Sequence, residues 1–337
     1  MEKIRWSLDK LVTKGKISKE EGDEIYSRIT PVVDLNDAVK DAELVIEVVP
    51  EIMDLKKQVY AELDKVAKPE VIFASNTSTL PITEIANTTS RPDKFIGIHF
   101  FNPPQLMKLV EIIPGEKTSQ EVTEITQEFV KSVNKQAVLC RKDVPGFIIN
   151  RLFIPMVHEA CYMQDRTGAS LEEIDSAVKF KLGFPMGIFE LADFTGMDVI
   201  HKATVEMHLR DKKVINPHKM IEKMFDEKKL GQKSGEGYYK YSDDKYERVE
   251  LSEELAQKCN PIQLVANVLN NAAWLITNGA SDIEEIEKAA KLGLGLRKPL
   301  FETAKEIGLQ NIVDELNNLA QEHGEFYKPD RLLETMI

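Results

Sequence analysis

The chain has 337 residues, of which 42% are hydrophobic and 30% charged, so we expect a globular protein with two or three domains. Its 44 basic and 56 acidic residues give a net charge of −12, which disfavours a nucleic-acid partner. No apolar run approaches the roughly 18 residues of a membrane span, so we expect no membrane partner. The three cysteines, Cys140, Cys161 and Cys259, are too scattered for a zinc or redox pair. We therefore expect no metal site, and reduced thiols in a cytoplasmic protein.

The start of the chain has the pattern of two helices. An apolar stripe runs from Ile4 to Val12 and ends at Gly15. Ser18 is followed three residues later by Glu21, the signature of a capping box at the start of a second helix.

Short apolar runs then alternate with helical patterns. Strands are expected at Leu44–Val49, Val71–Ser75 and Phe95–Phe100, with a helix at Asp54–Ala67 between the first two. A further strand is expected near Thr30–Val33. This alternation predicts an α/β domain with a Rossmann-like parallel sheet and helices on both faces.

From Val144 onward we expect helices only, arranged as an internal repeat. Gly168-Ala169-Ser170 recurs as Gly279-Ala280-Ser281, and later features recur at offsets between 110 and 112 residues. We therefore predict a partial α/β domain at 1–143, two related all-α domains at 144–241 and 260–337, and a polar linker at 242–259.

Three polar residues are placed where a parallel sheet binds ligands, beyond the carboxyl ends of its strands. Ser78 follows one strand, His99 ends the next, and Glu111 lies far enough downstream to return beside His99. Taken alone, His99 is more often a structural histidine and Ser78 a turn or cap residue. Taken together they suit proton removal from an alcohol, because a carboxylate that orients a histidine fixes its tautomer.

Five segments resemble those of 3-hydroxyacyl-CoA dehydrogenases: Ser75–Ser78, Gly97–Pro103, Lys108–Glu111, Pro145–Arg151 and Leu230–Tyr239. The resemblance runs along the whole chain. It implies NAD as cofactor and the oxidation of (S)-3-hydroxyacyl-CoA to 3-oxoacyl-CoA, an oxidoreductase step of fatty acid β-oxidation or related acyl-CoA metabolism.

The resemblance also implies residue roles. His99 is expected to be the catalytic base, Glu111 to orient it, and Ser78 and Asn150 to contact the 3-oxygen of the substrate. On the cofactor side it implies Glu47 near the nicotinamide, together with Ser78, Asn102 and Lys240.

The sequence departs from the family at the dinucleotide-binding loop. It contains no G-x-G-x-x-G motif after a strand, and the resemblance implies that a strand, this loop, a helix and a second strand precede the first helix. In a sheet of order 3-2-1-4-5-6 the central strands would then be missing. Thr30–Val33 and Leu44–Val49 would be separated, with two unpaired edges, and NAD would bind weakly.

The tandem repeat implies an intrachain pseudo-dimer of helical domains, and the resemblance allows an enoyl-CoA hydratase domain or subunit as a partner. Two alternatives stay open. One is a truncated, catalytically inactive acyl-CoA-binding or assembly subunit of the same family. The other is a different Rossmann β-hydroxyacid dehydrogenase, a group that typically uses a lysine base.

Overall fold

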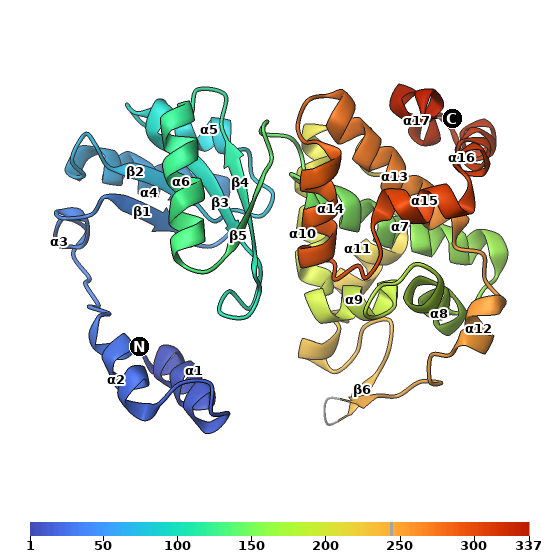
Figure 1. Cartoon of the computed structure of the whole chain (residues 1–337), viewed down its shortest axis with the longest axis horizontal. Helices are drawn as coiled ribbons and strands as arrows, with labels where there is room; N and C mark the ends of the chain where they lie inside the picture. The colour runs from blue at the N-terminus through green and yellow to red at the C-terminus, as the bar shows by residue number, and fades with distance from the viewer. Residues whose placement is uncertain (243–244, 337) are drawn as a thin grey trace.

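The computed structural model describes residues 1–242 and 245–336, which form an α/β half and a helical half joined side by side (Figure 1). The α/β half contains one five-stranded sheet of order β1-β2-β3-β4-β5. Its strands are β1 (Leu44–Glu47), β2 (Ile72–Ser75), β3 (Phe95–Phe100), β4 (Leu109–Pro114) and β5 (Gln136–Leu139). The three strands expected from the apolar runs are confirmed, two of them slightly shorter than expected.

The sheet is mostly parallel, with one exception. β1, β2 and β3 pair in parallel and so do β4 and β5, but β3 and β4 are antiparallel. Residues 101–108 connect β3 to β4 without a helix, and so short a connection can only reverse the chain direction. This reversal places Glu111 opposite His99.

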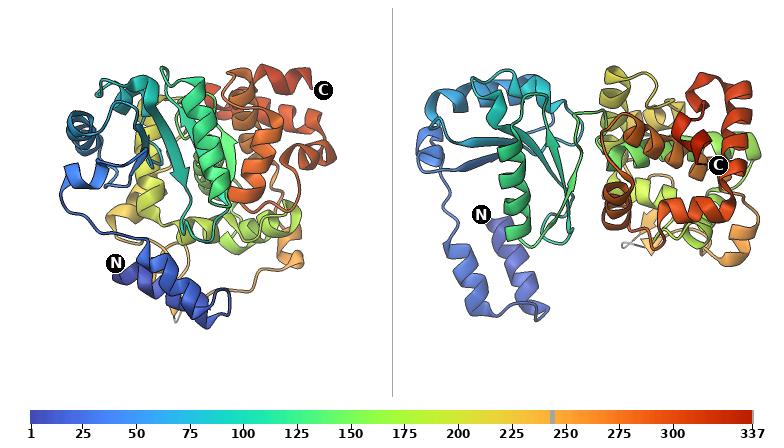
Figure 2. Two further views of the ribbon diagram at one scale, coloured as in Figure 1. Left: turned by 60° about the vertical axis from the view of Figure 1, so that its left-hand side comes forward. Right: turned by 45° about the horizontal axis from the view of Figure 1, so that its top comes forward.

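Helices cover both faces of the sheet (Figure 2). One face packs against α4 (Met53–Val66) and α5 (Ile82–Ala86), with the Tyr60 ring 4.5 Å from that of Phe95. The other face packs against α6 (Gln120–Ser132), whose Val122 and Val130 are buried with alternate strand residues. This alternation follows from the two-residue period of a strand.

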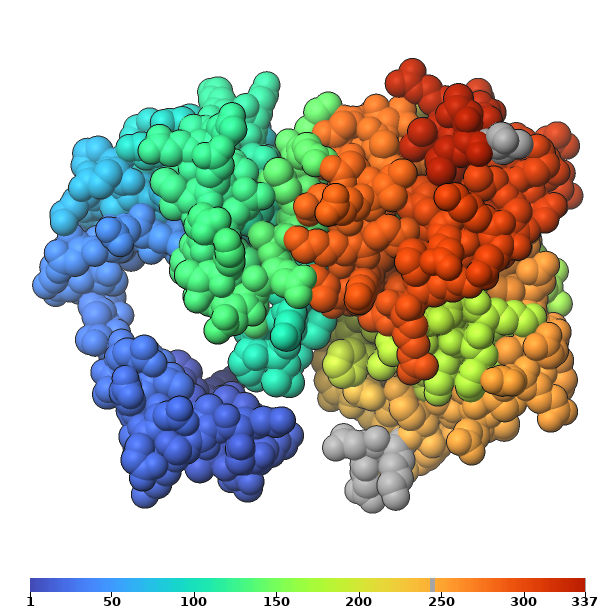
Figure 3. Space-filling model, in the orientation of Figure 1, coloured from blue at the N-terminus to red at the C-terminus, as the bar shows by residue number. Residues whose placement is uncertain are grey.

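The first two helices form a hairpin that stands away from the sheet, with open space beside it (Figure 3). They are α1 (Glu2–Thr13) and α2 (Lys19–Ser27), and the capping box of Ser18 and Glu21 is present. The strand expected at Thr30–Val33 does not form, and Val33 is fully exposed before α3 (Leu35–Val39). Among the described residues β1 pairs only with β2, so this segment has no neighbouring strand to join.

The helical half is built from two copies of one five-helix pattern. The first copy comprises α7 (Ile149–Thr167), α8 (Leu171–Lys181), α9 (Ile188–Thr195), α10 (Met197–Arg210) and α11 (Lys219–Asp226). The second comprises α13 (Ile262–Thr277), α14 (Ile283–Gly293), α15 (Leu300–Ile307), α16 (Leu309–His323) and α17 (Arg331–Thr335). Helices α8 and α14, and α9 and α15, correspond end to end at an offset of 112 residues, which confirms the internal repeat.

The two copies pack against each other through α7 and α13. The Arg151 guanidinium lies 3.3 Å from the centre of the Trp274 ring, and Arg166 Nη2 donates to Gln263 Oε1 at 2.8 Å. Arg166 also contacts Glu159, whose pKa burial raises to about 7. The seam between the copies therefore combines apolar packing with buried polar contacts.

The described part of segment 242–259 is more ordered than a linker, and the expectation of helices only after Val144 is wrong here. It contributes to a two-stranded antiparallel ribbon and to a short helix that packs on α8, namely β6 (Tyr241–Ser242), β7 (Lys245–Tyr246) and α12 (Glu253–Gln257). Leu251 and Ala256 are buried there, and the burial of these apolar side chains anchors an otherwise polar segment.

In the part of the chain that the structure describes, three 3₁₀ helices complete the secondary structure, at Pro92–Lys94, Gln232–Ser234 and Glu325–Tyr327. Over residues 1–242 and 245–336, no helix has both the length and the apolar character needed to cross a membrane.

Candidate active site

The candidate site lies where the loops after β2 and β3 meet the start of α7. His99 is the fifth residue of β3 and Glu111 the third of β4, and they are direct partners in the antiparallel register. Their side chains meet, with His99 Nδ1 2.8 Å from Glu111 Oε2. Both are buried, His99 at 5% exposure and Glu111 at 0%. Since the carboxylate accepts a hydrogen bond from Nδ1–H, Nε2 is left with a lone pair that can take a proton.

Glu111 is held by a second set of donors. Its other oxygen, Oε1, accepts the backbone N–H groups of Ile148 at 3.0 Å and Ile149 at 2.9 Å. These donors are the N-cap and the first residue of α7, and they follow a turn in which Gly146 and Phe147 both have positive φ, 79° and 51°. A non-glycine residue in that region is strained, and such strain is typically kept at functional sites. The buried carboxylate is thus fully paired, as its burial requires.

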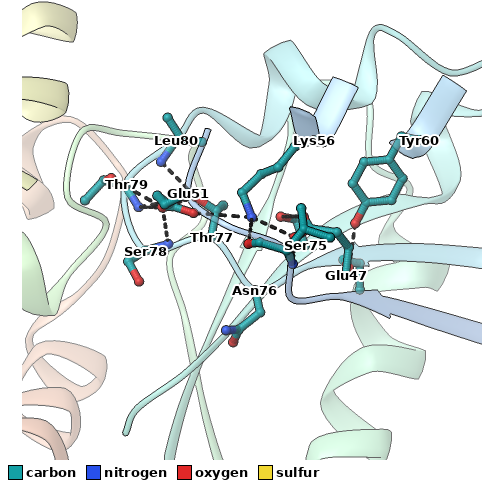
Figure 4. Close-up of polar contacts among 12 residues, drawn as sticks. Glu47, Glu51, Lys56, Tyr60, Ser75, Asn76, Thr77, Ser78, Thr79 and Leu80 are labelled. Carbon is teal, nitrogen blue, oxygen red and sulfur yellow. Dashed lines mark hydrogen bonds and ion pairs between the residues drawn. The ribbon is translucent and has the colours of Figure 1, made fainter. Parts of the chain in front are cut away.

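Ser78 and Asn150, to which the resemblance assigned the same substrate oxygen, lie beside each other. Asn150 Nδ2, on the first turn of α7, donates to the backbone carbonyl of Ser78 at 2.9 Å. The Ser78 hydroxyl has no hydrogen-bond partner among the described residues and points away from the polar network around Lys56 (Figure 4). Asn76 Oδ1 accepts the backbone N–H of Phe100 at 2.8 Å, which ties the loop after β2 to the end of β3.

Glu47 is enclosed in a different network. Its Oε1 accepts Lys56 Nζ and the Val49 N–H, both at 2.7 Å, and its Oε2 accepts the Ser75 hydroxyl at 2.7 Å (Figure 4). The side chains of Glu47 and Lys56 are each 1% exposed. The structure therefore does not bring the Glu47 carboxylate to the open edge where Ser78 lies.

Glu51, which the sequence patterns did not single out, lies at that edge instead. Its Oε1 accepts the Thr77 hydroxyl at 2.6 Å and the backbone N–H groups of Ser78 and Thr79 at 2.8 and 3.1 Å (Figure 4). Its Oε2 is 3.3 Å from Lys56 Nζ, and its side chain is 25% exposed. Its position after the end of β1 is the signal that could have identified it, because polar residues there face the ligand edge of a sheet.

Asn102 and Lys240, the two remaining residues expected on the cofactor side, are exposed. Asn102 is exposed in the loop after β3, three residues beyond His99. Lys240 is exposed and pairs through its backbone with Glu236 and Glu247. In the part of the chain that the structure describes, no hydrogen bond or ion pair joins its side chain to His99, Ser78 or Asn102.

Two family models match this chain. The model described as 3-hydroxyacyl-CoA dehydrogenase, NAD binding domain, matches residues 1–144. The model described as 3-hydroxyacyl-CoA dehydrogenase, C-terminal domain, matches residues 146–241 and 263–337. Both carry the name of the family that the sequence motifs resemble.

Individual proteins agree with these matches. The mitochondrial hydroxyacyl-coenzyme A dehydrogenase of Rattus norvegicus is 41% identical over 239 residues, covering 70% of this chain and 76% of that protein. The 3-hydroxybutyryl-CoA dehydrogenase of Clostridioides difficile is 42% identical over 238 residues, covering 70% and 84%. The crystal structure of 3-hydroxybutyryl-CoA dehydrogenase from Escherichia coli K12 superposes with a TM-score of 0.86 at 27% identity, covering 99% of this chain and 89% of that one.

Proposed function

The chain belongs to the 3-hydroxyacyl-CoA dehydrogenase family, and we propose that it catalyses the NAD-dependent oxidation of (S)-3-hydroxyacyl-CoA to 3-oxoacyl-CoA. The observation that carries this proposal is the buried contact between His99 Nδ1 and Glu111 Oε2. It leaves the free Nε2 of His99 at the end of a strand, where the sheet binds ligands.

In the proposed mechanism His99 acts as general base. Nε2 accepts the proton of the 3-hydroxyl group, and the Nδ1–H bond to Glu111 stabilises the imidazolium that forms. NAD, when bound, supplies the acceptor for the hydride that leaves carbon 3. The Ser78 hydroxyl and the Asn150 amide are proposed to hold the 3-oxygen. This is supported by the hydrogen bond of 2.9 Å from Asn150 Nδ2 to the backbone carbonyl of Ser78, which keeps the two residues side by side.

The residues present suit the nicotinamide end of NAD better than its pyrophosphate. At the nicotinamide end, the free hydroxyl of Ser78 and the exposed amide of Asn102 are suitable donors, and we propose Glu51 rather than Glu47 as the carboxylate that orders this edge. Lys240 is kept as a proposed cofactor-side residue on the resemblance alone. For the pyrophosphate, the sequence offers no G-x-G-x-x-G loop, and no step is assigned to that end.

Several wider features are proposed on the same basis. The domains are proposed to be 1–143, 144–241 and 260–337, with 242–259 between the last two. The protein is proposed to act in the cytoplasm, which its three buried free cysteines support. An acyl-CoA is the proposed substrate, and a hydratase domain or subunit that supplies it is proposed from the resemblance.

The proposal is tested by following NADH formation from (S)-3-hydroxybutyryl-CoA at increasing NAD concentration. We expect a rate that depends on His99: replacing it with Gln should lower kcat/KM by ~10²–10⁴-fold, or roughly 2.7–5.5 kcal/mol. His323→Gln, in an exposed position of the second copy, serves as the matched control. Equal rates for the His99 variant and the parent would overturn the assignment.

The alternative of a catalytically inactive acyl-CoA-binding subunit is favoured by one observation, the lack of a glycine-rich loop in the sequence. It predicts binding of acyl-CoA without NADH formation at any NAD concentration. Calorimetry with acyl-CoA alongside the rate measurement therefore distinguishes the two functions.

A further inference from the structure

The outer edge of β5 is covered by a helix of the second helical copy. β5 is the last strand of the sheet, so its outward backbone groups lack a strand partner. Helix α14 lies along this edge (Figure 1), where Glu285 Oε2 accepts the Leu139 N–H at 2.9 Å and Lys288 Nζ donates to the Ala137 carbonyl at 2.6 Å. These two side chains satisfy backbone groups that a sixth strand would otherwise pair.

The same helix continues toward the residues that hold Glu111. Gly293 is the last residue of α14, and a Cβ built on it would lie 2.8 Å from both Ile149 Cδ1 and Leu109 Cδ2. Leu109 is two residues before Glu111 on β4, and Ile149 donates its N–H to Glu111 Oε1. The end of α14 therefore sits between the strand that carries Glu111 and the helix start that binds it.

The close approach leaves little freedom at this point. Leu109 is 0% exposed and Ile149 3%, so neither side chain has open space into which to move. In a core packed to crystal-like density, one added methyl group has to displace a neighbour. A displacement here changes the distance between β4 and the first turn of α7, and with it the hydrogen bonds to Glu111.

We propose that α14 of the second helical copy positions the His99–Glu111 pair, with Gly293, Glu285 and Lys288 as positioning residues. The second copy then supports the site of the first within one chain. The expected effect on kcat/KM rests on the proposed function, whereas the expected effect on the contact between His99 and Glu111 does not.

The experiment compares Gly293→Ala with the double variant Gly293→Ala/Ile149→Val. The second change removes the Cδ1 atom that the new Cβ would meet. Because Ala favours a helix more than Gly does, a loss in the single variant reports the contact and not the helix. Leu316→Ala, which removes a buried side chain of α16, is the control for loss of stability in the second copy alone.

The readout is the Nδ1–H resonance of His99 in protein labelled with ¹⁵N-histidine, assigned by its absence in His99→Gln. We expect Gly293→Ala to shift or broaden this resonance and to lower kcat/KM on the order of 10- to 10²-fold. Ile149→Val in addition should restore both in part, because the contact of the new Cβ with Leu109 Cδ2 remains. Leu316→Ala should lower the melting temperature and leave the resonance unchanged.

A second pair of variants tests the β5 edge. Glu285→Ala removes the acceptor of the Leu139 N–H, whereas Glu285→Gln keeps one. We expect the Ala variant to perturb the His99 resonance and the Gln variant to preserve it.

An unchanged resonance in both Gly293→Ala and Glu285→Ala would overturn the positioning role, even if His99→Gln had established the proposed activity. Conversely, a perturbed resonance in a protein without NADH formation would support the positioning role and refute the proposed function.

Discussion

His99 and Glu111 are direct register partners across the antiparallel pair β3–β4, and their side chains meet at 2.8 Å on the face that turns toward α7. In a strand, a slip of one residue moves every side chain to the opposite face. The pairing of the proposed base with its carboxylate is therefore fixed by the sheet itself.

Replacing Glu111 with Gln should impair His99 as the proposed base while leaving His99 in its place on β3. The carboxylate accepts from His99 on one oxygen and from Ile148 and Ile149 on the other, and an amide has only one oxygen for these donors. We expect kcat/KM to fall by up to about 10²-fold. Steady-state rates with (S)-3-hydroxybutyryl-CoA provide the measurement, and parental rates would show that the contact is dispensable.

Replacing either of the two glutamates near the end of β1, Glu47 or Glu51, should have a different effect. Glu47→Ala leaves the buried Lys56 Nζ with two contacts of 3.3 Å, to Glu51 Oε2 and to the Val49 carbonyl. Losing its nearest buried partner costs roughly 3–5 kcal/mol of unfolding free energy. Glu51→Ala removes the acceptor that orders residues 77–79, so we expect a lower kcat/KM for NAD and a smaller loss of stability. Urea unfolding together with rates at several NAD concentrations separates the two. The interpretation fails if both variants behave alike.

His158 should make the protein sensitive to acid. Burial, followed by the charges of neighbouring histidines, lowers the pKa of His158 to about 3. The geometry agrees, because His158 Nδ1 accepts the backbone N–H of His218 at 2.9 Å and His158 Nε2 lies 2.8 Å from the Thr204 hydroxyl. These partners suit a neutral imidazole.

The lowered pKa of His158 determines how the stability of the protein changes with pH. Between pH 6.5 and 3 the unfolded chain binds a proton at His158 that the folded chain does not, so stability is present above 6.5 and falls with falling pH. Between pH 7 and pH 5 this group should contribute about 2 kcal/mol of lost stability. Urea unfolding of the parent and of His158→Gln at both pH values measures the difference, and His323→Gln is the control. Equal pH dependence in the parent and the His158 variant would count against a neutral buried imidazole.

NAD should bind this 337-residue chain weakly. Ser78, Asn102 and Glu51 are proposed for the nicotinamide end and not for the pyrophosphate, and the sequence has no glycine-rich loop to supply N–H donors to the pyrophosphate. Each missing charge-assisted hydrogen bond is worth roughly 1.5–3 kcal/mol, so we expect no saturation at millimolar NAD. Adding a strand–glycine-loop–helix–strand segment, in cis or as a peptide, should restore binding. Isothermal calorimetry decides the matter, and micromolar affinity for the chain alone would refute this account of how NAD is held.

The sequence by itself determined the local elements of this protein. The apolar runs predicted β1, β2 and β3, and Ser18 and Glu21 predicted a capped helix. The recurrence of sequence features at offsets of 110 to 112 residues predicted the two helical copies. These features could be predicted because strand alternation, helix capping and repetition depend on residues close together in the chain.

Only the tertiary structure decided which side chains meet. Glu47 and Glu51 are four residues apart, and both follow apolar residues, yet one is enclosed by Lys56 and Ser75 while the other holds the loop at Ser78. The strand expected at Thr30–Val33 failed because a strand requires a neighbour, which its own residues cannot supply. The contact of α14 with the supports of Glu111 joins residues more than 140 positions apart. Such pairings depend on the register of the sheet and the packing of the repeat, and no local pattern encodes either.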